Sequence, residues 1–245
     1  MTWPAIRWSG TPVATAAVMQ AIDAEARAGF GIEPRQLMEL AGFQVARFVD
    51  DWLGGAAGKR IAVIAGAGNN GGDALAAARF LSQRGGEVVA WIVEARDPES
   101  LAASHARTLR AMGIPCASAM GSVDLDADVL LDGLLGTGIR IPLREPAAGL
   151  IRAINDAGRP VIAIDLPSGL VADTGAGDGS AVQAAATVTL GLPKPALRTA
   201  RSGGRLFLAD IGLPAALFGP ARPAVQALYR SGDLVELVGA TQTPS

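Results

Sequence analysis

A glycine-rich segment, Gly66–Asp73, is the first place in this 245-residue sequence where residue types and spacing indicate chemistry. Gly66, Gly68 and Gly71 have the G-x-G-x-x-G spacing with which backbone N–H groups and a helix N-terminus face a pyrophosphate. Glu94, at the end of the next apolar run, fits the acid of that dinucleotide-binding pattern. The segment predicts a nucleotide site or, in the plainer alternative, a tight Asn-Gly turn.

Polar side chains in the same segment depart from an ordinary pyrophosphate loop. Asn69 and Asn70 add amide donors and acceptors that a simple phosphate cradle does not need. Asp73, placed in the first turn of an expected helix, suits the helix dipole but would repel a pyrophosphate bound there. In the plainer alternative, Asp73 is only a helix-start residue.

A second acid, Asp132, ends a short apolar run and is followed by the loop 133–142. The glycines of this loop let the backbone approach a ligand closely, and Thr137 and Arg140 carry groups that bind phosphate oxygens. The segment predicts a ligand-binding loop, with a mobile surface loop and a solvated arginine as the alternative.

A third acid, Asp165, ends another apolar run and is followed by Pro167 and Ser168. An acid at the tip of a central strand is suited to general acid–base catalysis, although these residues also form turns. Ser168 is not expected to be a hydrolase nucleophile, because G-x-S-x-G is absent and the lone histidine, His105, has no evident route to it. Lys194, between two prolines, is either a positioned ammonium or an exposed loop lysine.

Short apolar runs alternate with helical segments from residue 60 onward, and this order predicts how the acids are positioned. Such runs are typical of a parallel sheet covered on both faces, whose ligands bind beyond the carboxyl ends of the strands. The expected strands are 61–65, 88–93, 129–132, 161–165, 185–190 and 206–209, and the expected helices between them are 74–84, 98–112 and 146–157.

Two helices are expected before this alternation, because apolar residues recur there at helical spacing. The first is expected over about 11–28 and the second over about 33–54. We therefore predict one α/β domain over residues 1–245, with residues 1–58 as a helical extension within it.

The composition excludes several classes of protein. Half of the residues are hydrophobic and 18% are charged, so the chain is not disordered. A net charge of −2 argues against a nucleic-acid or membrane-surface binder. One cysteine and one histidine cannot supply an intramolecular disulfide or a four-ligand zinc site. The charge-free runs are shorter than the ~20 residues of a membrane helix and no export signal is found, so a cytoplasmic protein is expected.

Taken together, these segments resemble the N-terminal domain of the YjeF family, the NAD(P)H-hydrate epimerases. The resemblance is carried, in chain order, by Glu39-Leu40-Ala41-Gly42, Gly68-Asn69-Asn70-Gly71-Gly72-Asp73, Asp132-x-x-x-Gly136-Thr137-Gly138, Asp165-Leu166-Pro167-Ser168-Gly169, Pro193-Lys194-Pro195 and Asp210-Ile211-Gly212-Leu213-Pro214. Asn-Asn-Gly-Gly-Asp after a strand is specific, and its co-occurrence with Pro-Ser-Gly is more so. The chain departs from the family at Gly133, often Ala, and at Ala74, commonly Gly.

The resemblance implies a Rossmann-like, three-layer αβα sandwich with a mostly parallel central sheet. It also implies a metabolite-repair isomerase that interconverts the R and S forms of hydrated NADH and NADPH (NADHX and NADPHX), which carry a hydroxyl on C6 of the nicotinamide ring. A separate S-specific dehydratase then restores the reduced cofactor. Because the chain stops soon after Pro214, it resembles a stand-alone epimerase, and a homodimer through the N-terminal helices is also expected.

The resemblance also implies roles for individual residues. The substrate-binding set would be Asn69, Asn70, Gly71, Gly72, Asp73, Gly136, Thr137, Gly138, Ile139, Arg140, Ile141, Pro142 and Asp165. Asn70, Asp132 and Ser168 would hold one potassium ion per subunit, and oxygens with a single carboxylate suit a weakly hydrated monovalent cation. Asp165 is the hypothetical acid–base group that protonates the departing hydroxyl so that the ring nitrogen expels water. Lys194 would orient Asp165 or a phosphate.

Two other functions stay open on the sequence alone. One is an NAD(P)-dependent oxidoreductase that uses the glycine spacing and Glu94, and it would change the absorbance of the reduced nicotinamide with some substrate. The other is a non-catalytic nucleotide-binding or scaffold module of the same fold. All three acids of the motifs are present, which favours an enzyme.

Overall fold

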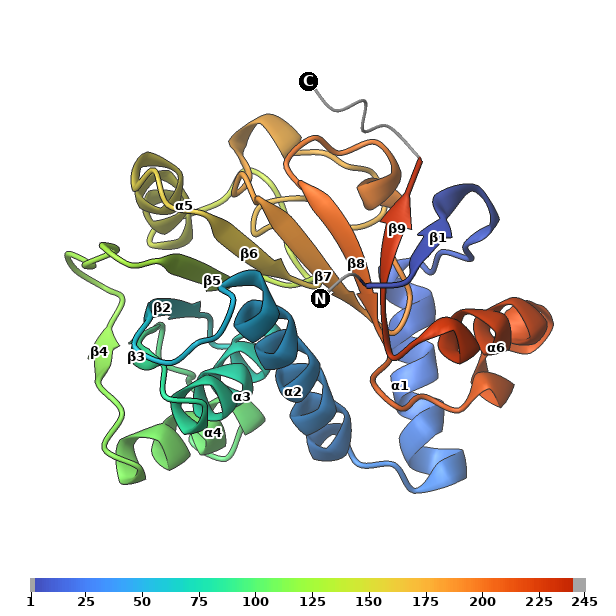
Figure 1. Ribbon diagram of the computed structural model, residues 1–245, viewed down its shortest axis with the longest axis horizontal. Helices are drawn as coiled ribbons and strands as arrows, with labels where there is room; N and C mark the ends of the chain where they lie inside the picture. The colour runs from blue at the N-terminus through green and yellow to red at the C-terminus, as the bar shows by residue number, and fades with distance from the viewer. Residues whose placement is uncertain (1–2, 240–245) are drawn as a thin grey trace.

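The structure is a computed structural model that describes residues 3–239 (Figure 1). Through this part of the chain runs a nine-stranded sheet with the order β1-β9-β8-β7-β6-β5-β2-β3-β4. Its strands are β1 (Ala5–Arg7), β2 (Arg60–Ala65), β3 (Glu87–Ile92), β4 (Cys116–Ser118), β5 (Val129–Gly133), β6 (Val161–Ile164), β7 (Ala186–Leu190), β8 (Arg205–Ala209) and β9 (Leu234–Val238). Neighbouring strands are parallel except β8 and β9, which confirms the mostly parallel sheet.

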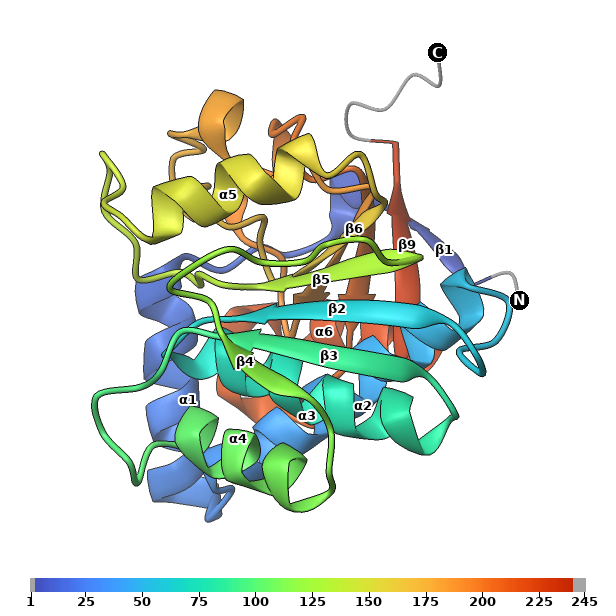
Figure 2. The ribbon, with the colours of Figure 1, turned by 90° about the vertical axis from the view of Figure 1, so that its left-hand side faces the viewer.

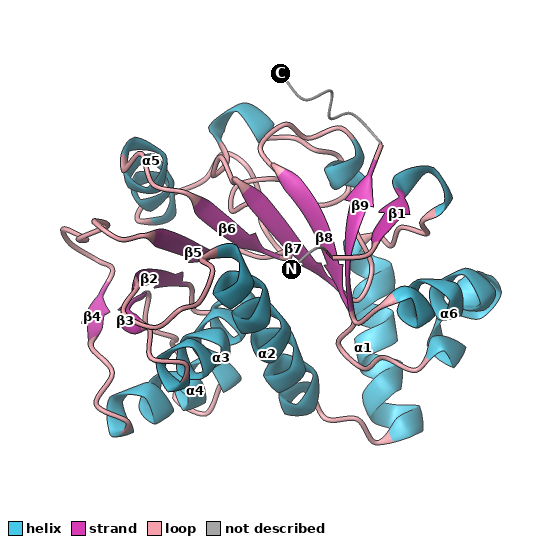
Figure 3. Ribbon diagram, viewed as in Figure 1, coloured by secondary structure: helices cyan, strands magenta, loops and turns pink. Residues whose placement is uncertain are grey.

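Helices lie on both sides of this sheet, as Figures 2 and 3 show. The α-helices of the described residues are α1 (Ala16–Phe30), α2 (Pro34–Trp52), α3 (Asn69–Gln83), α4 (Leu101–Ala111), α5 (Ala147–Asp156) and α6 (Arg222–Ser231). Helices α1 to α4 cover one face, and α5 with long loops covers the other. The predicted three-layer α/β fold is therefore confirmed, with a thinner layer on the α5 side.

Two apolar cores fill the space between these layers. The larger lies under α2 and α3, where Phe48 and Leu75 are fully buried, and the smaller lies under α5, around Ile151 and Ile154. Strands such as β5 are buried along their whole length. A strand buried on both faces has no polar side, which is why these segments read as continuous apolar runs.

The first helix begins later than its predicted start. Thr15 is the N-cap of α1, because its side chain accepts a hydrogen bond from the N–H of Val18 at 3.2 Å. Upstream, the N–H of Ala14 donates to the carbonyl of Pro193 at 3.0 Å, so this stretch is tied to a distant loop instead of helical. Gly31, with φ 66°, ends the helix in a left-handed conformation.

The second helix begins at Pro34, as predicted. Glu33 and Gln36 form a capping box, in which the N–H of Glu33 donates to the Gln36 side chain at 2.8 Å. The described part of residues 1–58 is nevertheless more than a helical extension, because it also supplies β1 at the edge of the sheet. Sequence analysis missed β1 and, elsewhere, β4, β9 and α6.

The strand order changes direction between β2 and β5. From β2 the chain moves outward to β3 and β4, and it then returns to β5 on the other side of β2. Ligands of open α/β sheets bind beyond the carboxyl ends of the strands at such a point. The segments that follow β2, β5 and β6 contain the candidate ligand-binding and catalytic residues that the sequence predicts. Among the described residues no helix combines the length and the apolar character needed to cross a membrane.

Candidate active site

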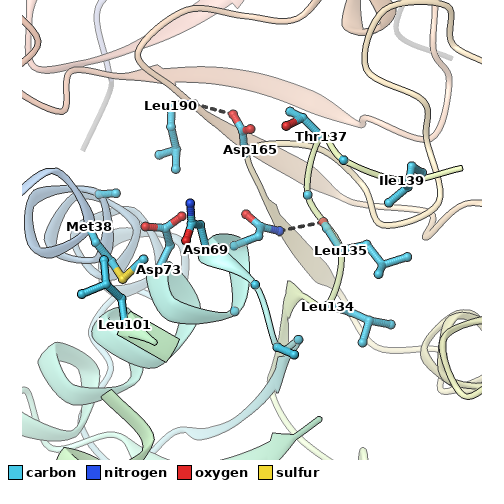
Figure 4. A pocket seen from close by; sticks show the side chains of 18 of the residues that line it. Met38, Asn69, Asp73, Leu101, Leu134, Leu135, Thr137, Ile139, Asp165 and Leu190 are labelled. Carbon is cyan, nitrogen blue, oxygen red and sulfur yellow. Dashed lines mark hydrogen bonds between the residues drawn. The ribbon is translucent and has the colours of Figure 1, made fainter. Parts of the chain in front are cut away.

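A cavity of about 680 Å³ lies at the carboxyl edge of the sheet (Figure 4). The segments after β2, β5 and β6 line it, together with α1 and α2. Its charged lining residues are Asp23, Asp73, Asp165 and Lys194, and apolar side chains from α2 and α4 complete the wall. The volume lies within the roughly 300–1,000 Å³ of small-molecule sites.

Most of the predicted substrate-binding set lines this cavity. The lining members are Asn69, Asn70, Gly71, Asp73, Gly136, Thr137, Gly138, Ile139 and Asp165. Gly72, Arg140, Ile141 and Pro142 are not among the lining residues. Gly72 packs on Met38 of α2, where an added Cβ would lie 2.6 Å from the sulfur, and the other three are exposed. A role of these four in binding stays a prediction.

Helix α3 begins inside the glycine-rich segment, earlier than the predicted residue 74. Asn69 is its first residue and Gly68 its N-cap, and no side chain caps this end. The first turn lines the cavity with backbone N–H groups that lack intrahelical acceptors, an arrangement that binds phosphate. Asp73 lies a full turn further on, so the alternative of a helix-start residue is wrong.

The glycine spacing of this segment also serves close packing. A Cβ on Gly71 would lie 1.8 Å from the carbonyl oxygen of Gly66, and a Cβ on Gly66 would lie 1.9 Å from that of Leu134. Glu94 is ion-paired with Arg110 and does not line the cavity. The acid required by an ordinary dinucleotide fingerprint is therefore engaged elsewhere.

Asp165 and Lys194, the two predicted catalytic residues, form a buried ion pair in the cavity wall. The ammonium contacts Oδ1 of Asp165 and donates to the carbonyl of Leu190 at 3.1 Å. The N–H of Leu190 donates to the same Oδ1 at 3.1 Å, whereas Oδ2 accepts no hydrogen bond from the described residues. Lys194 is only 2% exposed, which rules out the alternative of an exposed loop lysine.

The backbone at Asp165 is also unusual. Its φ of 65° is the one positive value at a non-glycine among residues 3–239. This conformation costs about 1–3 kcal/mol and persists where the surroundings hold it. Here the N–H of Asp165 donates to the carbonyl of Val188 at 2.8 Å, so the neighbouring strand β7 holds the turn.

The three residues predicted to bind potassium meet beside the cavity. Ser168 donates to Asp132 twice, from Oγ to Oδ1 at 2.6 Å and from its N–H to Oδ2 at 2.8 Å. Asn70 donates from Nδ2 to the carbonyl of Leu135 at 2.8 Å, and the N–H of Leu135 donates to Ser168 Oγ at 2.8 Å. One network therefore joins the segments after β2, β5 and β6.

The carboxyl group of Asp132 is fully buried among neutral donors. Burial raises its pKa to about 6, against the lowering effect of hydrogen bonds from Ser168 and the N–H of Leu134. No cluster of three or more His, Cys, Asp or Glu suited to a metal occurs in residues 3–239. One carboxylate with amide, hydroxyl and carbonyl oxygens fits a monovalent cation better than a divalent one.

Asp73 faces the same cavity from α3. It is 9% exposed and has no hydrogen-bond or ion-pair partner among the described residues. Burial, followed by the negative charge of Asp165, raises the pKa of Asp73 well above its usual value, while Lys194 lowers it. This shift keeps Asp73 protonated to a higher pH than an exposed aspartate, and so weakens the repulsion of a pyrophosphate that the sequence predicts.

Asp23, on α1, is a cavity residue that sequence analysis missed. Although Asp23 is exposed, the cavity walls remove part of its hydration, which raises the pKa of Asp23. The charge of Lys194 lowers this pKa, and the charge of Asp165 raises it. In the sequence Asp23 is a single acid on an alanine-rich helix. Only the packing of α1 beside the sheet brings it to the cavity.

Ser168 and His105 do not form a nucleophile pair, as expected. The Ser168 hydroxyl is bound to Asp132. His105 lies on α4, outside the cavity lining, with its Nδ1 atom 4.0 Å from a carboxylate oxygen of Glu39. Burial lowers the pKa of His105. A serine-hydrolase mechanism therefore has no support in this geometry.

These features define an α/β protein of Rossmann-like order whose ligand cavity lies at the point where the strand order reverses. The chain belongs to the family described as YjeF-related protein N-terminus, whose sequence profile matches residues 34–196. The matched region contains the segments after β2, β5 and β6 and also Lys194.

Relatives of known name agree with this assignment. Two proteins named "Bifunctional NAD(P)H-hydrate repair enzyme Nnr", from Thermofilum pendens and Moorella thermoacetica, are each 38% identical to this chain. The matches cover 87% and 82% of this chain, but the chain spans only 43% and 40% of those proteins. The crystal structure of yeast ynu0, YNL200c, has a TM-score of 0.76 and 25% identity and covers 95% of this chain and 97% of the yeast chain.

Proposed function

We propose that this chain is an isomerase that interconverts the R and S epimers of NADHX and NADPHX at C6 of the nicotinamide ring. The observation that carries the proposal is Asp165, which has one oxygen anchored by Lys194 and the other free at a nucleotide-sized cavity. The family, together with relatives whose name specifies NAD(P)H-hydrate repair, supports the substrate class.

The cavity offers groups for each part of such a ligand. The uncapped first turn of α3 suits the pyrophosphate, and the loop residues Gly136 to Ile139 form the facing wall. The altered ring then lies near Asp165, beyond the end of β6. The exposed Arg140 is available to a phosphate at the cavity rim.

Epimerisation requires the C6–O bond to break and to form again on the other face of the ring. Protonation of the hydroxyl by Asp165 lets the lone pair of the ring nitrogen expel water, and the carboxylate that remains stabilises the resulting cation. Water then adds to the opposite face and loses a proton. No electrons are gained or lost, so the reduced-nicotinamide absorbance of an oxidoreductase assay does not change.

We further propose one potassium ion per subunit on Asn70, Asp132 and Ser168. Two observations support the fit: the buried Asp132 has no cationic partner among the described residues, and the Leu135 carbonyl adds a further oxygen. When bound, the ion would supply positive charge that balances Asp132. The amide of Asn70 would then present its oxygen, and the three segments would be held at fixed spacing.

Epimerisation alone does not restore the reduced cofactor. A dehydratase that accepts only the S epimer must act after it and remove the added water. Three expectations stay predictions. They are that a separate protein supplies the dehydration, that the chain forms a homodimer through its N-terminal helices, and that it is cytoplasmic.

The test measures epimer interconversion directly. Hydrated NADH is treated with an S-specific dehydratase until the S form is consumed, and this protein is then added at neutral pH with potassium. We expect rapid loss of the remaining R form. Asp165→Asn should lower the rate at least ~100-fold and keep ligand binding, because charge and proton transfer are lost but shape is not.

Asp156→Asn, an exposed acid at the end of α5, is the matched control and should keep full activity. Near-normal turnover by the Asp165 variant would contradict the role of Asp165. Wild-type protein that binds the ligand without converting it would instead favour the scaffold function.

A further inference from the structure

Two acids on different walls of the cavity differ in their hydrogen-bond and ion-pair partners. Asp165, at the end of β6, has Oδ1 bonded to Lys194 and to the N–H of Leu190. Asp73, one turn into α3, is buried to the same extent, yet no described residue donates to it. Figure 4 shows both side chains at the cavity, Asp73 beside Asn69 and Asp165 beyond it.

We propose that Asp73 is a second catalytic residue, which exchanges a proton with the C6 oxygen on one face of the ring while Asp165 serves the other face. This inference rests on the proposed epimerase function. An acid on one face of a ring reaches only the hydroxyl of that face. Because the two epimers carry their hydroxyls on opposite faces, the reaction needs a proton-transfer group on each.

The charged groups around Asp73 favour its protonated form. Asp23 on α1, Asp165 and Lys194 are the charged groups that act on Asp73, and the ammonium pairs with Asp165 rather than with Asp73. On the other flank of α3, Glu39 of α2 is paired with Arg79. Burial and the adjacent negative charge keep Asp73 protonated to a higher pH than an exposed aspartate. One buried carboxyl group paired with an ammonium and another without a partner, in a single cavity, are the surroundings expected of a base and an acid.

The proposed step balances in atoms and charge. For the epimer whose hydroxyl faces Asp73, the carboxyl group of Asp73 donates its proton to that oxygen. The C6–O bond breaks as the nitrogen lone pair forms a C=N bond, and one water molecule leaves. A second water adds to C6 from the opposite face and gives one proton to Oδ2 of Asp165. Exchange with solvent returns the two acids to their starting states.

Asp73→Asn is the direct test, because asparagine keeps the size of the side chain without a proton to transfer. We expect at least ~100-fold slower epimerisation, with affinity for NADHX changed no more than a few-fold. A variant that binds NADHX and turns over at the wild-type rate would overturn the inference and leave the epimerase function intact. Wild-type protein without epimerase activity would contradict the proposed function itself.

Thermal unfolding separates this role from a structural one. The pKa of Asp73 is higher in the folded than in the unfolded chain, so ionisation of Asp73 lowers stability as the pH rises through the folded pKa. Asparagine cannot ionise, and we expect the variant to melt above wild type at pH 8 and by a smaller margin at pH 5. A variant that is both slow and less stable at pH 8 would indicate a structural role and contradict the inference.

The pH profile supplies a second readout. Wild-type activity should fall at high pH as Asp73 loses its proton. Asp23→Asn removes a nearby negative charge, which lowers the pKa of Asp73 and moves this alkaline limb to lower pH. An alkaline limb that stays in place in the Asp23 variant, or moves upward, would contradict the assignment.

Discussion

At the residue scale, one carboxylate oxygen of Asp165 accepts hydrogen bonds from three donors in the cavity wall. The ammonium of Lys194, the N–H of Leu190 and the hydroxyl of Thr189 all donate to Oδ1, the hydroxyl at 3.3 Å. A carboxylate held by one oxygen keeps its other oxygen free and in a fixed direction. Catalysis by a positioned charge requires both features.

Lys194→Met tests this arrangement. The substitution leaves a mostly buried carboxylate without its ion-pair partner, which costs several kcal/mol at a fully buried site. Because the Asp165 side chain is 13% exposed, we expect a loss of about 2–3 kcal/mol in the free energy of unfolding by denaturant, together with slower epimerisation.

The double variant Lys194→Met, Asp165→Asn is the control. Removal of both charges should restore most of the lost stability, because no uncompensated charge is left, but it should not restore activity. Equal losses in the single and double variants would show that Lys194 stabilises the fold by packing alone.

The positions of some cavity residues could be predicted from the sequence and others could not. An acid at a strand end predicted that Asp165 lies at a ligand site, whereas Pro193-Lys194-Pro195 left Lys194 open between a positioned ammonium and an exposed loop lysine. The protonation state of Asp73 depends on burial and on charges that come from three other elements. Asp23 has no motif around it, and the chain brings it to the cavity only through the packing of α1.

At the element scale, the start of α3 shows how packing overrides local preference. Glycine disfavours helix by about 1 kcal/mol, and the sequence predicts Gly71 and Gly72 in a loop before a helix over 74–84. Both lie in the helix, and a Cβ on Gly71 would lie 1.8 Å from the carbonyl oxygen of Gly66, so the close packing of this turn requires glycine at position 71. The short strands β1 and β4 went undetected for a related reason: three residues carry no periodicity, and their hydrogen bonds come from distant strands.

Gly133 of β5 and Ala74 of α3 meet at a close contact between the strand and the helix. A Cβ on Gly133 would lie 2.4 Å from the Cβ of Ala74, so this contact has room for only one of the two methyl groups. Glycine at position 133 therefore lets α3 pack closely against β5.

Gly71→Ala and Gly68→Ala should differ sharply in how much they lower the free energy of unfolding. The first places a Cβ 1.8 Å from a backbone oxygen of Gly66, and overpacking against backbone costs about 1–3 kcal/mol or more. The second meets open space at an N-cap with φ −99°, and it should cost about 1 kcal/mol or less. Urea unfolding of both variants measures the difference, and equal stability would contradict the packing role of Gly71.

At the scale of the whole molecule, the reversal of strand order explains why motifs far apart in the chain lie at one cavity. Strands β2, β5 and β6 are neighbours in the sheet although their residues are far apart in the chain. The alternation of apolar runs predicted this sheet and the edge at which the cavity lies. It did not predict the antiparallel β9 or the edge strand β1, because pairing at a sheet edge depends on where the ends of the chain return.

Potassium should stabilise the whole fold, because its proposed ligands come from three segments joined only through the sheet. A cation that binds the folded chain alone stabilises it by about 2.7 kcal/mol at 100 times its Kd, which raises Tm by several degrees for a chain of this size. We expect a higher Tm in potassium chloride than in sodium chloride at equal ionic strength. Ser168→Ala should abolish the difference, since it removes a ligand and a donor to Asp132. Ser180→Ala, an exposed serine, should preserve it, and equal melting of wild type in both salts would exclude a potassium-selective site.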